Sequence, residues 1–328
     1  MPPLELSIVV PVYRSANTLP TLVERLRATL NGLGVSFEII LVDDGSPDNA
    51  WPVLAGLQRQ HPDRLVTVQL MRNYGQHNAI MCGFRRAKGR YVVTLDDDLQ
   101  NPPEEIPKLY RAIQQRDLDL VYGKPDEKQH AGWRNAGSWM VNFFFRKVFR
   151  TDVSVTSFRI IRRELVECTF AYALNFTFVD GLLAWNTQRI GTVEVEHHAR
   201  AEGRSGYSLA KLATLGLNLF TNFSLWPLRT ISLCGLGSAG LGFLAALYYL
   251  VKYLTDNITV PGYASLIVTI LFLGGVQLLA LGVMGEYLGR LHLNVNRKPQ
   301  YVERQALPPR SQGHLGNEAD DSADARAA

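Results

Sequence analysis

Two long apolar runs in the last third of the chain constrain its fold most. They cover residues 230–254 and 263–288, and their only charged residues, Lys252 and Glu286, lie close to the ends of the runs. A helix crosses the hydrocarbon core of a bilayer with about 20 residues. Helices buried in a soluble core seldom remain apolar on every face for so long. The two runs therefore predict two transmembrane helices.

The charges around these runs predict their orientation. Residues 255–262, between the runs, contain one acidic residue and no basic residue. Basic residues lie on the outer sides of the pair: Arg200, Arg204, Lys211 and Arg229 before it, and Arg290, Arg297, Lys298 and Arg304 after it. By the positive-inside rule, both termini and the large N-terminal part of the chain are expected in the cytoplasm.

Two segments beside the runs have compositions of their own. Residues 209–228 are apolar and aromatic but too polar to span a membrane. We expect one or two amphipathic helices there, lying in the membrane interface with Trp226 at the depth of the lipid headgroups. After Gln305 the chain is polar and acidic, which predicts a solvated tail.

From residue 6 to residue 188, short apolar runs alternate with charged segments. Strands are predicted at residues 6–10, 37–42, 65–70, 91–95 and 118–123, and helices at residues 19–30, 49–59, 77–87 and 104–115. Apolar strands that alternate with helices are typical of an α/β fold with a mostly parallel sheet covered on both faces.

Acidic clusters follow two of these strands. Asp43 and Asp44 come directly after the second strand, and Asp96, Asp97 and Asp98 follow the fourth. In such sheets, ligands bind beyond the carboxyl ends of the strands. Side chains two residues apart on an extended segment point the same way, so Asp96 and Asp98 can face one cation. Carboxylate oxygens together with substrate phosphates suit Mg²⁺ or Mn²⁺.

Other features exclude several classes of function. The net charge of +4, from 34 basic and 30 acidic residues, is too small to indicate nucleic-acid binding. The 3 cysteines lie far apart, which argues against a zinc site or a disulfide framework. The sequence has no P-loop, and its G-x-G-x-x-G at residues 235–240 lies inside a predicted span. The adjacent His197 and His198 would point to opposite faces of a strand, so they are not expected to share a metal ion.

Five motifs give the chain a specific resemblance. Residues 8–13 read IVVPVY, residues 42–46 read VDDGS, and residues 95–104 read LDDDLQNPPE. Residues 72–79 (RNYGQHNA) and 200–205 (RAEGRS) extend the pattern. Together they resemble glycosyltransferase family 2, and within it the dolichol-phosphate mannose synthase group. Bacterial members of that group carry two C-terminal spans and transfer a sugar to undecaprenyl phosphate. The resemblance covers residues 6–304.

The resemblance implies a GT-A fold with a nucleotide-sugar site and a Mg²⁺ or Mn²⁺ ion. It implies that the nucleotide sugar is bound by Pro11, Tyr13, Asp43, Asp44, Asp96 and Asp97. The implied metal ligands are Asp96, Asp98 and Gln100. A divalent cation would stabilise the charge that develops on the nucleoside diphosphate as the glycosidic bond breaks.

Arginines are expected to position the two anionic reactants. A lipid phosphate is largely ionised at neutral pH and needs no strong general base, whereas guanidinium groups bind phosphate bidentately. We expect Arg134, Arg159 and Arg200 to have this role. Together with Asp96 and Asp98 they are the predicted catalytic residues. Weaker candidates at the lipid phosphate are Arg200, Arg204, Ser205 and Asp180. The chain departs from many relatives at Thr156-Ser157, where those have Gly-Asp or Ser-Gly, so no acid can be assigned there.

We therefore predict an inverting, metal-dependent transfer of a sugar, from a UDP-sugar in preference to a GDP-sugar, to polyprenyl phosphate on the cytoplasmic face of a bacterial inner membrane. One alternative is a catalytically silent scaffold of an envelope-glycan assembly complex, although the intact D-x-D and Gln100 argue against it. Another is a processive polysaccharide synthase, which is disfavoured because the sequence contains no Q-x-x-R-W. Small residues in the spans favour a homo-oligomer.

These expectations divide the chain into four parts. Residues 1–208 are predicted to form the cytoplasmic catalytic domain, and residues 209–229 the interface helices. Residues 230–290 are predicted to form the two spans, and residues 291–328 a cytoplasmic basic segment with a disordered tail. The expected partners are the nucleotide sugar, the polyprenyl phosphate and the lipid bilayer, with no nucleic acid.

Overall fold

The computed structural model describes residues 4–125, 155–172, 177–198, 226–255, 262–295 and 299–309. The chain divides into two compact units, one of residues 1–206 together with 299–328, the other of residues 207–298. Several predicted features lie outside the described residues: Arg134, Arg200, Arg204, Ser205, most of the interface helices at 209–229, and the tail beyond residue 309.

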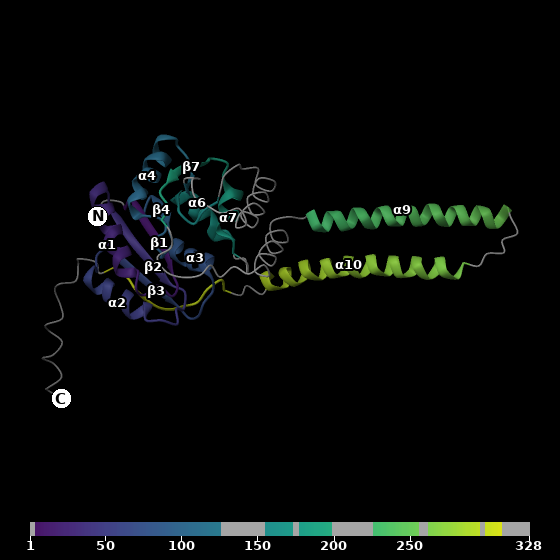
Figure 1. Ribbon diagram of the computed structural model, residues 1–328, viewed down its shortest axis with the longest axis horizontal. Coiled ribbons are helices and arrows are strands. Elements are labelled where there is room, and N and C mark those ends of the chain that lie inside the picture. The colour runs from purple at the N-terminus through teal and green to yellow at the C-terminus, as the bar shows by residue number, and fades with distance from the viewer. Residues whose placement is uncertain are drawn as a thin grey trace, which may run out of the picture. The chain divides into compact units, whose positions relative to one another are not determined.

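The first unit is built on an eight-stranded sheet with the order β7-β5-β6-β4-β1-β2-β3-β8 (Figure 1). The strands are β1 (Leu6–Val12), β2 (Phe37–Asp43), β3 (Leu65–Leu70), β4 (Tyr91–Thr94), β5 (Leu120–Pro125), β6 (Arg159–Arg162), β7 (Ile190–Val195) and β8 (Glu303–Leu307). β1 is parallel to β2 and β4, β2 to β3, and β5 to β7. β6 and β8 are antiparallel to their neighbours. The predicted mostly parallel sheet is confirmed.

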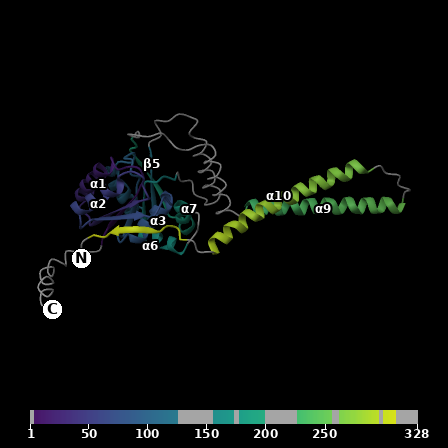
Figure 2. The same ribbon diagram turned by 90° about the horizontal axis from the view of Figure 1, so that it is seen from below.

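Helices cover both faces of the sheet. One face packs against α1 (Leu19–Leu33), α2 (Ala50–Gln60) and α4 (Ile106–Gln115), which follows the short 3₁₀ turn η1 (Pro103–Glu105). The other face packs against α3 (Gln76–Arg86), α6 (Arg163–Cys168) and α7 (Val179–Asn186), with the turn η2 (Thr169–Ala171) between the last two. Figure 2 shows α1 and α2 on one side of the sheet and α3 and α6 on the other.

The central strand shows why the sequence forms this layered core. Every residue of β1 is buried. Because side chains alternate across a strand, Ile8 and Val10 pack into the cluster on one face, and Val9 packs into the cluster on the other. A strand buried on both faces reads as a continuous apolar run. This is the pattern by which β1, β2 and β3 can be recognised in the sequence.

β8 was not expected. Residues 303–307 form a strand antiparallel to β3, where the sequence indicated only a basic segment and a tail. Glu303 forms an ion pair with Arg86 of α3, and the Met71 amide donates to the Val302 carbonyl at 2.9 Å. The segment ERQAL is polar and lies at the edge of the sheet, so it has no apolar periodicity to reveal it. The first unit is therefore discontinuous in sequence.

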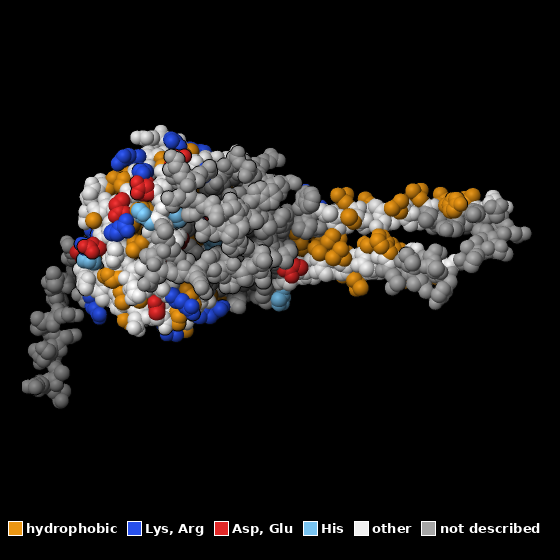
Figure 3. All heavy atoms as spheres, in the orientation of Figure 1, with side chains coloured by type: hydrophobic (Ala, Val, Ile, Leu, Met, Phe, Trp, Pro, Cys, Tyr) orange, Lys and Arg blue, Asp and Glu red, His pale blue; other side chains and the backbone are white. Residues whose placement is uncertain are grey.

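The second unit consists, in its described part, of two long helices. They are α9 (Trp226–Thr255) and α10 (Tyr263–Val295), and they contact each other. Hydrophobic side chains are exposed along both helices (Figure 3). Within α10, Phe272–Gly289 has a mean hydropathy of 1.3 with none of it buried, and is long and apolar enough to cross a membrane. The apolar stretch of α9, Leu228–Leu244, is shorter. Length and composition thus support one of the two predicted spans.

Candidate functional site

A pocket of about 270 Å³ opens at the carboxyl ends of β1, β2 and β4. It is lined by Pro11, Val12, Tyr13, Asp44, Asn73, Gly75, Gln76, Asp96, Asp97 and Asp98. Parallel strands place their carboxyl ends at the same edge of a sheet, which brings together loops that are far apart in the sequence. Six residues predicted at the nucleotide or the metal gather here: Pro11, Tyr13, Asp44, Asp96, Asp97 and Asp98.

Asp44 organises the loop after β3. Its Oδ1 accepts a hydrogen bond from the Tyr74 amide at 2.7 Å, and its Oδ2 accepts one from the Gly75 amide at 2.8 Å. Burial raises the pKa of this carboxyl group to about 6, although the two backbone hydrogen bonds oppose the shift. Next to it, a Cβ on Gly45 would lie 2.5 Å from the carbonyl carbon of Arg72. The two loops therefore pack so closely that only glycine fits at residue 45.

Asp97 holds the loop after β1. Its Oδ2 accepts from the Tyr13 amide at 2.9 Å and from the Ser15 hydroxyl, while its carbonyl oxygen accepts from the Thr18 hydroxyl at 2.8 Å. Burial raises the pKa of this carboxyl group. The carboxylate thus fastens the backbone that carries Tyr13, another residue of the pocket.

Asp96 is held by two side chains from other parts of the fold. Gln76 donates from Nε2 to Asp96 Oδ1, and Ser157 donates from Oγ to Asp96 Oδ2, each at 2.6 Å. Burial first, and then the charges of Asp98 and Asp97, raise the pKa of the Asp96 carboxyl group to about 6. A cluster of carboxylates with raised pKa values is a place where a cation is favoured.

The other predicted acidic and amide residues support the pocket from its edge. Asp43 is fully buried and does not line the pocket; it accepts from the Ser46 amide at 2.9 Å and from Gln69 Nε2 at 3.1 Å. The backbone amide of Gln100 donates to Asp98 Oδ1 at 3.2 Å, but Gln100 is not among the lining residues. Leu99 between them has φ 59°, a left-handed conformation that bends this loop sharply.

Arg159 lies behind the pocket. Its side chain is 1% exposed and forms an ion pair with Asp180, which also accepts from the Tyr122 hydroxyl at 2.9 Å. Neither Arg159 nor Asp180 lines the pocket. The structure therefore pairs Arg159, the guanidinium predicted for phosphate binding, with Asp180, the acid named as a weaker candidate at the lipid phosphate.

The paired histidines lie beside the acidic loop. The His198 amide donates to the Gln100 carbonyl at 2.9 Å, and His197 Nδ1 lies 3.4 Å from Asn101 Oδ1. In the part of the chain that the structure describes, no group of three His, Cys, Asp or Glu side chains could hold a metal. A magnesium site does not need one, because Mg²⁺ typically takes one or two carboxylates and completes its shell with water and substrate phosphates.

Sequence reasoning assigned no role to Asn73, Gly75 or Gln76, which the structure adds to the pocket. They belong to the RNYGQHNA segment, and hydrogen bonds from the Tyr74 and Gly75 amides to Asp44 hold this segment at the pocket. The hydrogen bond between Tyr74 and Asp44 joins residues 30 positions apart, so no local sequence pattern predicts it.

Comparison with known proteins agrees with this architecture. Residues 7–170 match the profile of glycosyl transferase family 2, and residues 227–291 match a profile described as the GtrB C-terminal hairpin. The undecaprenyl-phosphate 4-deoxy-4-formamido-L-arabinose transferase of Pseudomonas paraeruginosa is 39% identical over 92% of this chain and 91% of its own length. The transferase of the same name from Aeromonas hydrophila is 36% identical over 93% and 96%.

Among solved structures, glucosyl-3-phosphoglycerate synthase from Mycobacterium tuberculosis, in complex with Mn²⁺ and UDP, is similar with a TM-score of 0.49 and 18% identity. The match covers 66% of this chain and 77% of that chain.

The mostly parallel sheet, the acidic pocket at its strand ends and the matched profile define an enzyme of the GT-A class of glycosyltransferases. The chain belongs to glycosyl transferase family 2.

Proposed function

We propose that this enzyme transfers a sugar from a UDP-sugar to undecaprenyl phosphate with inversion at the anomeric carbon. The observation that carries the proposal is the acidic pocket at the ends of β1, β2 and β4. It occurs in a chain that aligns over 92% of its length with a transferase named for undecaprenyl phosphate. The sugar in that relative's name, 4-deoxy-4-formamido-L-arabinose, is the first to test.

The donor set of the pocket fits a hard divalent cation, Mg²⁺ or Mn²⁺. Asp96 and Asp98 would supply carboxylate oxygens from the lining of the pocket, and we assign Gln100, which lies at its edge beside Asp98, as the third ligand. Burial of the Asp96 carboxylate beside two others raises its pKa to about 6, a cost that a cation relieves. When bound, the ion would neutralise the charge that develops on the leaving nucleoside diphosphate. Pro11, Tyr13 and Asp44 would line the base and ribose, with Asp43 supporting Asp44's loop.

The acceptor phosphate needs positive charge rather than a base. We assign this role to Arg134 and Arg200, with Arg204 and Ser205 beside Arg200, because guanidinium forks bind phosphate bidentately. Arg159 acts from behind the pocket: its positive charge lowers the pKa of Asp96 and favours the ionised carboxylate.

We propose the membrane arrangement in the same terms. α9 and α10 form two spans with both termini in the cytoplasm, residues 209–229 lie in the interface, and the enzyme resides in a bacterial inner membrane. The exposed apolar surface of both helices supports this arrangement. Small residues along them, such as Gly235 and Gly282, favour self-association.

The test uses the full chain in detergent with undecaprenyl phosphate, Mn²⁺ and a panel of UDP- and GDP-sugars, UDP-4-deoxy-4-formamido-L-arabinose among them. Mass spectrometry of the organic extract should show a sugar-phosphate lipid. Asp98→Ala should abolish the product, whereas Asp63→Ala, which removes an exposed carboxylate remote from the pocket, should not. UDP binding without product from any donor would contradict the assigned sugar or acceptor, and the absence of UDP binding as well would favour a silent scaffold.

A further inference from the structure

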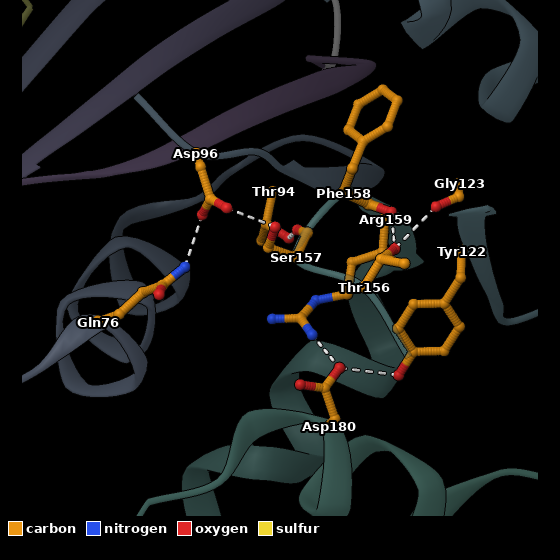
Figure 4. Close-up of polar contacts among 10 residues, drawn as sticks. All are labelled: Gln76, Thr94, Asp96, Tyr122, Gly123, Thr156, Ser157, Phe158, Arg159 and Asp180. Atoms are coloured by element: carbon orange, nitrogen blue, oxygen red, sulfur yellow. Dashed lines mark hydrogen bonds and ion pairs between the residues drawn. The ribbon is translucent and has the colours of Figure 1, made fainter. Parts of the chain in front are cut away.

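Both oxygens of the Asp96 carboxylate are held by neutral donors that lie outside the acidic loop (Figure 4). Gln76 at the start of α3 binds Oδ1, and Ser157 before β6 binds Oδ2, each at 2.6 Å. A carboxylate oxygen has two acceptor sites. Each oxygen therefore keeps one site for a cation, while the two hydrogen bonds fix the plane and rotamer of the group.

Ser157 is itself fixed by the neighbouring strands. Thr94 of β4 donates from Oγ1 to the Ser157 carbonyl at 2.7 Å. The Thr156 hydroxyl lies 2.9 Å from the Gly123 carbonyl of β5 and 3.0 Å from the Phe158 carbonyl. These bonds tie the segment of residues 156–158 to both strands that flank it, so the backbone that carries the Ser157 hydroxyl is fixed relative to Asp96.

The other side of this segment is anchored by a buried ionic cluster. Arg159, two residues after Ser157, pairs with Asp180 of α7, and the Tyr122 hydroxyl of β5 donates to the same carboxylate oxygen. Figure 4 shows the segment between Asp96 on one side and Asp180 on the other. Removing either partner of a buried ion pair leaves an uncompensated charge and is strongly destabilising. The segment therefore cannot shift without a large loss of stability.

We propose that Ser157 and Gln76 are positioning residues that aim the Asp96 carboxylate at the cation, and that the Arg159–Asp180–Tyr122 cluster holds Ser157 in place. The inference rests on the proposed function, in which Asp96 is a ligand of the ion. Ser157 touches neither reactant in this scheme and acts through Asp96. Partners of metal ligands that orient them commonly change metal affinity by about 10- to 100-fold when removed.

The test measures Mn²⁺ binding to the full chain in detergent with UDP present, by the loss of the free-Mn²⁺ electron paramagnetic resonance signal. Ser157→Ala should weaken Mn²⁺ binding about tenfold, and Ser157→Thr, which keeps the hydroxyl, should restore it. In the transfer assay the KM for Mn²⁺ should rise with little change in kcat at saturating Mn²⁺. Gln76→Leu should act in the same direction. Tyr122→Phe should give a smaller loss of Mn²⁺ affinity, because Asp180 keeps its ion pair.

Ser36→Ala is the matched control, because Ser36 accepts a hydrogen bond from the Glu5 amide and does not line the pocket. Unchanged Mn²⁺ affinity in Ser157→Ala would overturn the inference. So would a loss of affinity that Ser157→Thr fails to restore. If the wild-type chain binds Mn²⁺ but transfers no sugar, the proposed function fails and the Mn²⁺ affinities still decide the inference. If the wild-type chain binds no Mn²⁺, both fail.

Discussion

Asp97 occupies the middle of three consecutive acids, and its carboxylate faces the protein's own backbone. One oxygen accepts from the Tyr13 amide and the Ser15 hydroxyl, so it holds the loop that shapes one wall of the pocket. Asp97→Ala should release this loop and weaken UDP binding about tenfold, equivalent to one or two hydrogen bonds. Asp97→Asn should bind UDP almost as well as the wild type, because an amide oxygen can accept from both donors. Calorimetry checks both variants, and equal UDP affinity in Asp97→Ala would contradict this role.

The raised pKa of Asp44 should make the free energy of unfolding depend on pH. Burial raises its pKa from 3.8 to about 6 in the folded chain. Folding therefore favours the protonated form, and this contribution to the free energy of unfolding is present below pH 4 and is lost as the pH rises to about 6. Asp44→Asn cannot ionise, so its stability relative to the wild type should increase over this range. Thermal unfolding in detergent at pH 4.5 and pH 7 checks the sign, and a constant difference between the two chains would refute it.

At the residue scale, the sequence allows the position of a side chain to be predicted where that side chain directly follows a strand. Asp44 and Asp96 can be placed because the end of a buried strand is visible in the sequence. The same reasoning could not predict the ion pair of Arg159, because its partner Asp180 lies on a helix 21 residues further along the chain. An arginine in an apolar strand is compatible with a ligand contact and with a buried ion pair, and only tertiary packing distinguishes the two.

Among the elements, β8 offers a test of how the edge of the sheet is held. Glu303 pairs with Arg86 and accepts from the Cys82 thiol, so it attaches β8 to α3 as well as to β3. Glu303→Ala should leave the half-buried Arg86 uncompensated and destabilise the β3–β8 pairing by about 1–2 kcal/mol. Amide hydrogen exchange in β3 should then become faster. Arg304→Ala, at the neighbouring exposed position, is the control and should leave exchange in β3 unchanged.

The strands that could be predicted from the sequence are the ones whose residues are buried. β1, β2 and β3 are runs of mostly buried residues, and the predicted ranges match them within two residues at each end. β6 is only four residues long and antiparallel, so its apolar stretch carried little signal beside the basic residues at both of its ends. β8 is held by backbone hydrogen bonds to β3, and backbone hydrogen bonds require no apolar pattern in the sequence.

The whole molecule consists of a sheet unit that is discontinuous in sequence and a unit of two long helices. Deleting the helical unit tests whether the sheet unit folds and binds its ligands without it. We expect a chain in which a flexible linker of about 15 residues replaces residues 207–298 to retain β8 and to bind UDP and Mn²⁺. It should fail to glycosylate undecaprenyl phosphate in vesicles, because the two proposed membrane spans are then absent. A chain that ends at residue 206 lacks β8 and should unfold at a lower temperature. Equal unfolding temperatures for the two chains would show that β8 adds no stability.

The position of β8 in the chain also determines the order in which the protein can mature on the ribosome. Translation delivers β1 to β7 first, then α9 and α10, and only afterwards residues 303–307. Throughout the synthesis of α9 and α10, β3 presents an open edge, and an unpaired strand edge can pair with another chain. In the proposed membrane arrangement, a nascent chain that stalls after α10 would thus be an anchored intermediate whose sheet is incomplete at β3.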